Sequence, residues 1–227
     1  MENINKTARR SVELFLWTAA IKKYSFIPIN SYHWNAFNGK LYCILIVDTI
    51  FFQQVICDES GKNLTSIPTD LLPNVTKLNL KNNKITLKYD RKILIRLSNL
   101  TELYLNENTI TLLYNNSFYS LTKLVILDIS NNCINTIHQA AFAGLYQLIV
   151  LNLSYNRITQ LDSDVLSSLK NLRVLNLQNN LLEYFHIKPS FKLTTITLDG
   201  NPWNCSCSLL DLQIWLTASN VTMGKFS

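Results

Sequence analysis

The sequence predicts an α/β solenoid, in which each turn has a short parallel strand on the concave face and a short helical or 3₁₀ turn on the convex face, with a helical cap at the C-terminal end. Three observations support this prediction. An eleven-residue phrase recurs six times, apolar pairs recur between the phrases, and an amphipathic helix pattern follows the last phrase. A chain of 227 residues has room for one such elongated solenoid with appendages.

The repeated phrase is apolar, two variable, apolar, one variable, apolar, two variable, Asn, one variable, apolar. It reads VTKLNLKNNKI, LTELYLNENTI, LVILDISNNCI, LIVLNLSYNRI, LRVLNLQNNLL and LTTITLDGNPW, starting at Val75, Leu100, Leu124, Leu148, Leu172 and Leu193. The phrase asparagine falls at Asn83, Asn108, Asn132, Asn156, Asn180 and Asn201, at intervals of 25, 24, 24, 24 and 21 residues. This period indicates a leucine-rich repeat array.

The spacing of the phrase predicts both a strand and a ladder of amides. Two apolar residues two positions apart, such as Leu78 and Leu80, point to the same side of a strand, so we expect them in the interior. The phrase asparagine follows where the chain bends, and a buried amide is costly unless its polar atoms are paired. Stacked coils solve this problem if each amide binds backbone groups of its own turn and of the neighbouring turn.

The return segments and the C-terminal end carry further apolar patterns. Pairs at i, i+3 spacing predict packed turns on the convex side: Phe118 and Leu121, Phe142 and Leu145, Leu166 and Leu169. After the last phrase, Leu209, Leu212, Trp215 and Leu216 share one face of a helix that would cover the last repeat as a lid. Upstream, Leu64 and Ile67 indicate a half-repeat that enters the first phrase.

Composition and charge narrow the classes of function. The chain is 48% hydrophobic, which is enough for a core. Its net charge of +6 is uneven, because residues 1–40 hold six basic against two acidic side chains, leaving 15 against 13 elsewhere. The sequence shows no basic stripe on the repeats, so it predicts no binding of nucleic acid.

The residue patterns of enzymes and metal sites are missing from the sequence. It has no glycine-rich phosphate loop, HExxH or CxxC, and its three histidines are His33, His138 and His186. A Cys133–His138 dyad lacks an orienting third group, and a small buried thiol is the favoured interpretation of Cys133. Cys205 and Cys207 cannot usefully bridge each other and lack two further zinc ligands. We therefore predict no catalytic residues, no metal and no cofactor.

The cap motif and the repeats resemble a known family. WNCSCSLLDLQIWL from Trp203 and NVTKLNL from Asn74 are similar to the extracellular leucine-rich repeat proteins with cysteine-bearing caps, which include Toll-like receptors and small leucine-rich membrane proteins. The family's C-terminal cap uses four cysteines, so the resemblance implies that Cys205 and Cys207 form disulfides with partners beyond Ser227. It also implies a location outside the cell or on the plasma membrane, and innate-immune signalling through NF-κB.

The sequence divides into five predicted regions. They are an unassigned N-terminal extension at 1–40, a hydrophobic leader or signal-anchor at 41–56, an N-terminal cap half-repeat at 57–74, six repeats at 75–198, and a truncated cysteine cap at 199–227. Glycosylation sequons fall at Asn63, Asn74, Asn99, Asn115, Asn152, Asn204 and Asn220. A glycan on Asn152 would stand on the concave face and obstruct its middle.

Two hypotheses about function remain open. The first is a receptor ectodomain that recognises a protein or another microbial or endogenous ligand, with its membrane segment missing from this chain or supplied by the signal-anchor. The second is a soluble or adhesion-type interaction module, or a decoy, without signalling of its own. On either hypothesis the best contact candidates are Lys77, Lys81, Tyr104 and Tyr155, since aromatic and cationic side chains often anchor interfaces.

Overall fold

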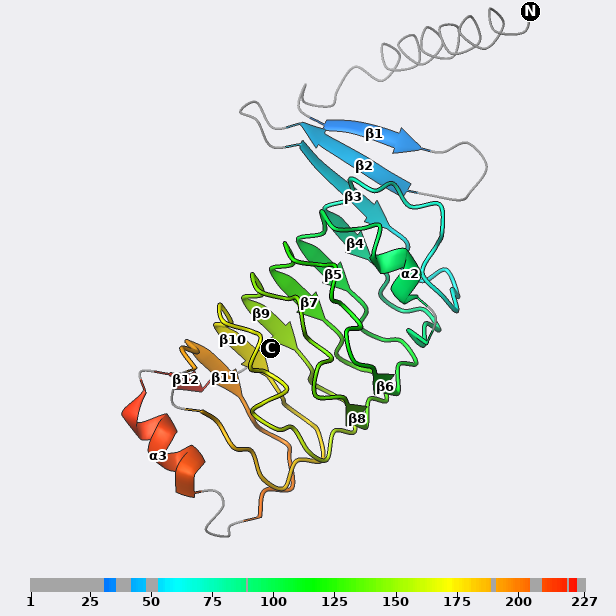
Figure 1. Ribbon diagram of the computed structural model, residues 1–227. Coiled ribbons are helices and arrows are strands. Elements are labelled where there is room, and N and C mark those ends of the chain that lie inside the picture. The colour runs from blue at the N-terminus through cyan, green and yellow to red at the C-terminus, as the bar shows by residue number, and fades with distance from the viewer. Residues whose placement is uncertain are drawn as a thin grey trace, which may run out of the picture.

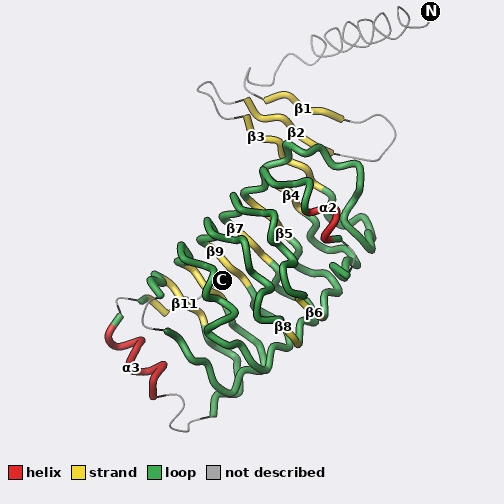
Figure 2. The backbone as a smooth tube through the Cα atoms, viewed as in Figure 1, coloured by secondary structure: helices red, strands yellow, loops and turns green. Residues whose placement is uncertain are grey.

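The protein is a curved stack of similar turns, with strands side by side on one face and return segments on the other (Figure 1, Figure 2). The computed structural model describes residues 31–35, 42–47, 53–88, 90–188, 191–204, 210–219 and 221–223. We call each turn, from one strand to the next, a coil. This architecture confirms the predicted α/β leucine-rich repeat solenoid.

The concave face is one ten-stranded sheet over the described residues. Its strands are, in spatial order, β1 (Ser31–Asn35), β2 (Tyr42–Val47), β3 (Gln53–Asp58), β4 (Lys77–Asn79), β5 (Glu102–Tyr104), β7 (Ile126–Asp128), β9 (Val150–Asn152), β10 (Val174–Asn176), β11 (Thr195–Thr197) and β12 (Thr222–Met223). All pairs from β3 to β12 are parallel, whereas β2 pairs antiparallel with β1 and with β3. The middle residue of each predicted strand, from Leu78 to Ile196, is fully buried.

The stack begins one coil earlier than the repeated phrase. Strand β3 pairs in parallel with β4 and places Cys57 opposite Leu78, where both side chains are fully buried. Cys57 is disulfide-bonded. The segment 41–56, for which the sequence suggests a leader or signal-anchor, thus contains β2 and part of β3, and its role in targeting stays a prediction. No helix among the described residues is long and apolar enough to cross a bilayer.

The repeated phrase is absent from the first coil because a charged pair replaces two of its defining residues. The register places Glu59 where later coils have the last strand leucine, and Lys62 where they have the asparagine. Glu59 is nevertheless 1% exposed, and its Oε2 lies 2.9 Å from Lys62 Nζ. A carboxylate is tolerated in such a place when it is paired. The first coil therefore shares the geometry of the others but not their sequence.

The phrase asparagines form a continuous ladder beneath the strands. Asn132 Nδ2 donates to the carbonyl of Ile129 in its own coil and of Leu105 in the preceding coil, at 3.1 and 3.0 Å. Its Oδ1 accepts the N–H of Ile110 at 3.0 Å. The same arrangement recurs at Asn83, Asn108, Asn156, Asn180 and Asn201. Each amide thus ties two coils together, and all but Asn201 are buried.

The residue before each ladder asparagine has a left-handed backbone. The φ angles are between 51° and 57° at Asn82, Glu107, Asn131, Tyr155 and Asn179, and 70° at Gly200. Asparagine and glycine adopt this conformation readily, but Glu and Tyr do so at a cost of roughly 1–2 kcal/mol. The turn geometry that aims each amide inward is therefore imposed by the stack and is not chosen by local preference alone.

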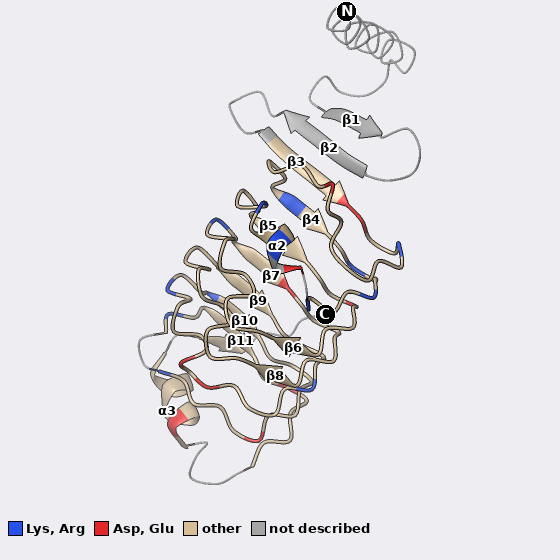
Figure 3. Ribbon diagram, turned by 45° about the vertical axis from the view of Figure 1, so that its right-hand side comes forward, with Lys and Arg blue, Asp and Glu red and all other residues tan. Residues whose placement is uncertain are grey.

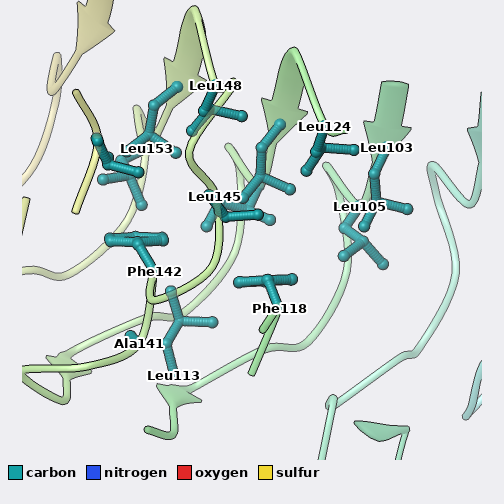
Figure 4. Close-up of a cluster of buried hydrophobic side chains, with 14 of the residues drawn as sticks. Leu103, Leu105, Leu113, Phe118, Leu124, Ala141, Phe142, Leu145, Leu148 and Leu153 are labelled. Carbon is teal, nitrogen blue, oxygen red and sulfur yellow. The ribbon is translucent and has the colours of Figure 1, made fainter. Parts of the chain in front are cut away.

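The return segments are packed turns, as predicted. Phe118 and Phe142 are fully buried, and their rings stack with centroids 6.3 Å apart and planes 6° apart (Figure 4). Successive i→i+3 backbone hydrogen bonds lead from these turns into the next strand, for example Leu121 N–H to the Phe118 carbonyl at 2.9 Å. The apolar pairs of the return segments thus complete a core that runs through all the coils.

Outside the main sheet lie a second, two-stranded sheet and one helical turn. Strands β6 (Leu112–Leu113) and β8 (Thr136–Ile137) pair in parallel, and helix α2 spans Arg91–Leu94. Just before α2, the Asp90 carboxylate is almost fully buried and accepts the N–H of Ile67 at 2.7 Å. Burial raises the pKa of the Asp90 carboxyl, and the hydrogen bond from Ile67 only partly offsets this effect.

An indole closes the ladder at the C-terminal end. From Leu80 to Leu177, each strand-end carbonyl accepts one amide from its own coil and one from the next coil. The carbonyl that follows, that of Leu198, accepts Asn201 Nδ2 at 3.0 Å and Trp203 Nε1 at 3.0 Å. Trp203 Nε1 thus takes the place on this carbonyl that the amide of the next coil takes on the earlier ones.

Helix α3 (Leu210–Ala218) follows, and it buries Leu212 and Trp215, two residues of the predicted lid face. Leu216 is partly buried against the core, whereas Leu209 lies outside the described residues. Strand β12 then adds to β11, extending the sheet beyond the predicted strands. The C-terminal end of the core is therefore covered by both a helix and a strand.

We expect Trp215→Ala to destabilise the protein by about 2–3 kcal/mol. Truncating a fully buried Trp costs about 3–5 kcal/mol, and a site at the end of a stack relaxes more freely. Ile214→Ala is the matched control, because Ile214 lies on the same helix but is 55% exposed. It should change the free energy of unfolding by less than about 0.5 kcal/mol. Urea denaturation of both variants measures the difference, and equal effects would contradict the lid.

Candidate recognition surface

The concave face presents three columns of side chains between the buried strand residues. Alternation along each strand turns these residues toward the inner surface. The columns are Lys77, Glu102, Ile126, Val150, Val174, Thr195; then Asn79, Tyr104, Asp128, Asn152, Asn176, Thr197; then Lys81, Asn106, Ser130, Ser154, Gln178, Asp199. The face is polar apart from the aliphatic middle of the first column, and four of its polar members, Ser130, Ser154, Asn176 and Thr197, are buried.

At the N-terminal end, three of these side chains form one cluster across β4 and β5. Lys77 Nζ lies 2.8 Å from Glu102 Oε2 and 5.2 Å from the centre of the Tyr104 ring. Tyr104 donates its hydroxyl hydrogen to the same Glu102 oxygen at 2.8 Å. The sequence paired Lys77 with Tyr104 as contact candidates but did not predict Glu102, which neutralises the lysine and holds both side chains in place.

The contacts within the cluster change the pKa values of two of its members, Glu102 and Tyr104. Burial alone would raise the pKa of the Glu102 carboxyl, but the hydrogen bonds from Lys77 and Tyr104 and the lysine charge outweigh it, so the pKa is lowered. Burial, followed by the hydrogen bond to Glu102 and its charge, raises the pKa of Tyr104 to about 12. At neutral pH Glu102 is therefore a carboxylate and Tyr104 a neutral phenol.

We expect Glu102→Gln to lower the free energy of unfolding by about 0.5–1 kcal/mol at pH 7, the usual range for a partly exposed ion pair. Because the pKa of Glu102 is depressed in the fold, its stabilisation is complete above the unfolded-state pKa and disappears as the pH falls through the folded-state pKa. Chemical denaturation at pH 7 and pH 3 should show the difference between the two proteins shrinking at pH 3.

Glu107→Gln is the matched control for this prediction. Glu107 lies 3.0 Å from Lys81 Nζ, but both side chains are more exposed than those of Lys77 and Glu102. Its substitution should therefore have a smaller effect at pH 7. A difference between Glu102→Gln and the unaltered protein that stays constant from pH 7 to pH 3 would show that the cluster does not act through its charge.

The structure does not bring Tyr155 to this cluster, contrary to the grouping drawn from the sequence. Tyr155 lies in the turn after β9, two strands beyond β5 in the sheet. Its side chain is 50% exposed because the left-handed turn before ladder residue Asn156 directs it to the solvent. Of the four contact candidates, only Lys77 and Tyr104 touch each other.

The middle of the concave face is a hydrogen-bonded polar network. Asp128 Oδ1 accepts the N–H and hydroxyl of Ser130, and its Oδ2 accepts Asn152 Nδ2 at 3.2 Å. Asn152 Oδ1 accepts the N–H and hydroxyl of Ser154 at 3.1 and 2.7 Å. The nitrogen that would carry a glycan is therefore already bound to Asp128, and the hydroxyl of its sequon is bound to the Asn152 side chain.

The other sequons differ in exposure. Asn63, Asn74, Asn115 and Asn204 are exposed, Asn99 is partly exposed, and Asn220 lies outside the described residues. Cys205 and Cys207 also lie outside the described residues. The side-chain nitrogen of Asn74, which would carry the glycan, makes no hydrogen bond within the described chain, whereas that of Asn99 donates to the Pro73 carbonyl at 3.4 Å.

The thiol and the histidines do not gather into a site. Cys133 is a free cysteine and is partly exposed, which corrects the expectation of a buried thiol, because the position after each ladder asparagine faces the flank of the coil. His138 packs beside Tyr114 with ring centroids 5.8 Å apart. In the described part of the chain, no group of three or more His, Cys, Asp and Glu residues could hold a metal ion.

Comparison with known proteins places the repeats among relatives. The leucine rich repeat family model matches residues 73–134 and 122–182. Leucine-rich repeat-containing protein 19 of Homo sapiens is 56% identical over 172 residues, or 75% of this chain and 46% of the relative. The Mus musculus protein is 52% identical over 171 residues, or 75% and 47%. The chain thus spans about half the length of the curated relatives it matches.

Two solved structures share the architecture. The LRIM1/APL1C complex is similar with a TM-score of 0.58 and 25% identity, covering 67% of this chain and 28% of that one. The TLR13–ssRNA13 complex has a TM-score of 0.54 and 30% identity, covering 57% and 19%. Because that complex contains single-stranded RNA, the exclusion of nucleic acid drawn from the sequence is not supported. The repeats, the ladder and these similarities together show that the chain belongs to the leucine-rich repeat family and resembles leucine-rich repeat-containing protein 19.

Proposed function

We propose that the chain is the recognition part of an extracellular leucine-rich repeat receptor. Proteins of this family are generally recognition modules, and the solenoid supplies an extended surface for a protein or another ligand. The observation that carries the extracellular assignment is the disulfide of Cys57, buried in the first coil, because disulfides persist in oxidising compartments. A structural disulfide at that position would not be stable in the cytosol.

Within this proposal, ligand contact falls on the concave face around Lys77 and Tyr104, where a cation and an aromatic ring are held rigidly by Glu102. The resemblance to leucine-rich repeat-containing protein 19 supports a further step, in which recognition leads to innate-immune signalling through NF-κB. The signalling step requires parts of the receptor beyond the described residues. The competing proposal is a soluble or adhesion-type module that binds the same ligand without signalling.

Glycosylation of the chain expressed in human cells tests the compartment. We expect peptide-N-glycosidase to increase its electrophoretic mobility, and we expect Asn74→Gln to remove one step of that shift, because this side chain is exposed. Asn152→Gln should leave the shift unchanged, since the Asn152 amide is bound to Asp128 on the concave face. Immunoblotting before and after enzyme treatment measures both effects.

The outcomes separate three possibilities. No mobility shift on the unaltered chain would contradict the extracellular proposal and favour a cytoplasmic scaffold. A shift with the protein retained at the cell surface supports a receptor that is anchored by segment 41–56. A shift with release into the medium excludes that anchor and is the result expected both for the soluble module and for a receptor whose membrane segment is not part of this chain. Loss of a glycan in Asn152→Gln would mean that the polar network on the concave face opens before the coils close.

A further inference from the structure

One edge of the solenoid, where the chain enters each strand, is free of acidic residues. We define it by the residues two before, one before and one after the first apolar residue of each phrase. In coil order these are Pro73, Asn74, Thr76; Ser98, Asn99, Thr101; Thr122, Lys123, Val125; Tyr146, Gln147, Ile149; Lys170, Asn171, Arg173; and Phe191, Lys192, Thr194. We call this edge the entry strip. Four of its members are basic and none is acidic.

Hydrogen bonds between neighbouring coils show that the entry strip is continuous. Backbone N–H groups of Val125, Ile149, Arg173 and Thr194 each donate to the equivalent residue of the preceding coil, at 2.8–2.9 Å. Side chains add further links: Lys123 Nζ donates to Asn99 Oδ1 at 2.9 Å, and Arg173 Nη1 donates to the Lys192 carbonyl at 3.2 Å. Figure 3 shows Lys and Arg in blue on several turns along one edge of the stack.

The cations of the entry strip are not neutralised within the described chain. Lys123, Lys170 and Lys192 are exposed, Arg173 is partly exposed, and none of them forms an ion pair with a described carboxylate. On the concave face, by contrast, both Lys77 and Lys81 are paired with glutamates. At about 4.8 Å per coil, the four cations span roughly 14 Å from the coil of β7 to the coil of β11.

We propose that the entry strip binds a sulfated polysaccharide. A line of unpaired cations without carboxylates attracts a linear polyanion. The strip has one strongly exposed aromatic ring among its described residues, Tyr146 at 53%, and single-stranded nucleic acid generally needs a series of rings for its bases. The choice of a sulfated polysaccharide over nucleic acid rests also on the proposed extracellular function. The strip also shows that the expectation of no basic stripe on the repeats was wrong. Its four basic residues are far apart in the sequence and come together only in the folded chain.

Binding of the full chain to immobilised heparin tests the inference. The variant Lys123→Gln/Lys170→Gln/Lys192→Gln should bind at least tenfold more weakly in 0.15 M salt than the unaltered protein, and it should elute at lower salt. The control Lys84→Gln/Lys92→Gln/Arg157→Gln removes the same charge from exposed residues outside the strip, and should bind within twofold of the unaltered protein. Circular dichroism checks that both variants are folded.

Two further ligands test which kind of polyanion binds the strip. Desulfated heparin should not be retained, and single-stranded RNA of the same total charge should bind more weakly than heparin. Equal weakening in both triple variants, unchanged binding in the strip variant, or tighter binding of RNA would each overturn the proposal. Because this measurement uses purified protein, it is independent of the glycosidase test. Failure of the heparin assay therefore leaves the extracellular function standing, and failure of the glycosidase assay leaves the strip's polyanion binding measurable.

Discussion

Asn132→Ala is expected to reduce the free energy of unfolding by about 3–5 kcal/mol. The substitution removes the contacts of Nδ2 with three carbonyls, which share its two hydrogens, and the hydrogen bond that Oδ1 accepts. The carbonyls of Leu105 and Ile129 keep their second amide partner, but the buried N–H of Ile110 loses its acceptor. The orphaned N–H adds its own cost of about 1–3 kcal/mol to the lost bonds. Chemical denaturation followed by circular dichroism measures the change.

Asn135→Ala is the control, because this asparagine lies in the same coil but its side chain is exposed. Its substitution should change the free energy of unfolding by less than about 0.5 kcal/mol. A loss below 1 kcal/mol for Asn132→Ala would mean that water replaces the amide without penalty. The ladder would then be a result of stacking and not one of its causes.

Phe142→Ala is expected to cost about 3–5 kcal/mol, the usual range for truncating a fully buried aromatic side chain. Phe142 packs on Phe118 of the preceding coil and lies among Leu113, Leu145 and Leu148 in the core (Figure 4). The cavity would therefore lie between two coils and weaken the contact between them as well as the coil itself. Thermal unfolding should show a lower Tm and, if the stack divides at this point, a broader transition.

Tyr119→Ala provides the comparison, since Tyr119 neighbours Phe118 in sequence but is 59% exposed. It should leave both Tm and the width of the transition close to those of the unaltered protein. A Phe142→Ala protein that unfolds with the same Tm would show that the convex turns contribute little to the core.

The strands and ladder could be predicted because one phrase encodes both. Alternating leucines fix the strand interior, and the asparagine position fixes the inward amide, so six coils follow from periodicity. The first coil could not be predicted in this way, because Glu59 and Lys62 replace the two residues that define the phrase. Only pairing with β4 reveals its strand. The left-handed turn at Glu107 and Tyr155 is equally hidden, since neither residue type favours it.

Surface arrangements were less accessible from the sequence. The cluster of Lys77, Glu102 and Tyr104 depends on which residues stand opposite each other in β4 and β5. The entry strip depends on stacking, which brings Lys123 and Lys170 to the same edge although 47 positions separate them in the chain. Charge counted along the sequence therefore gave no sign of the strip.

Trp203 has a consequence for how this kind of protein can change in length. Its indole nitrogen takes the place that the amide of another turn would otherwise occupy on the Leu198 carbonyl. A further ladder amide after the tryptophan would therefore compete with the indole for the same oxygen. Duplication or loss of interior turns meets no such obstacle, because each of them presents the same donors and acceptors to its neighbours. Growth by internal duplication, with the turn that carries Trp203 retained, is the route that this architecture leaves open.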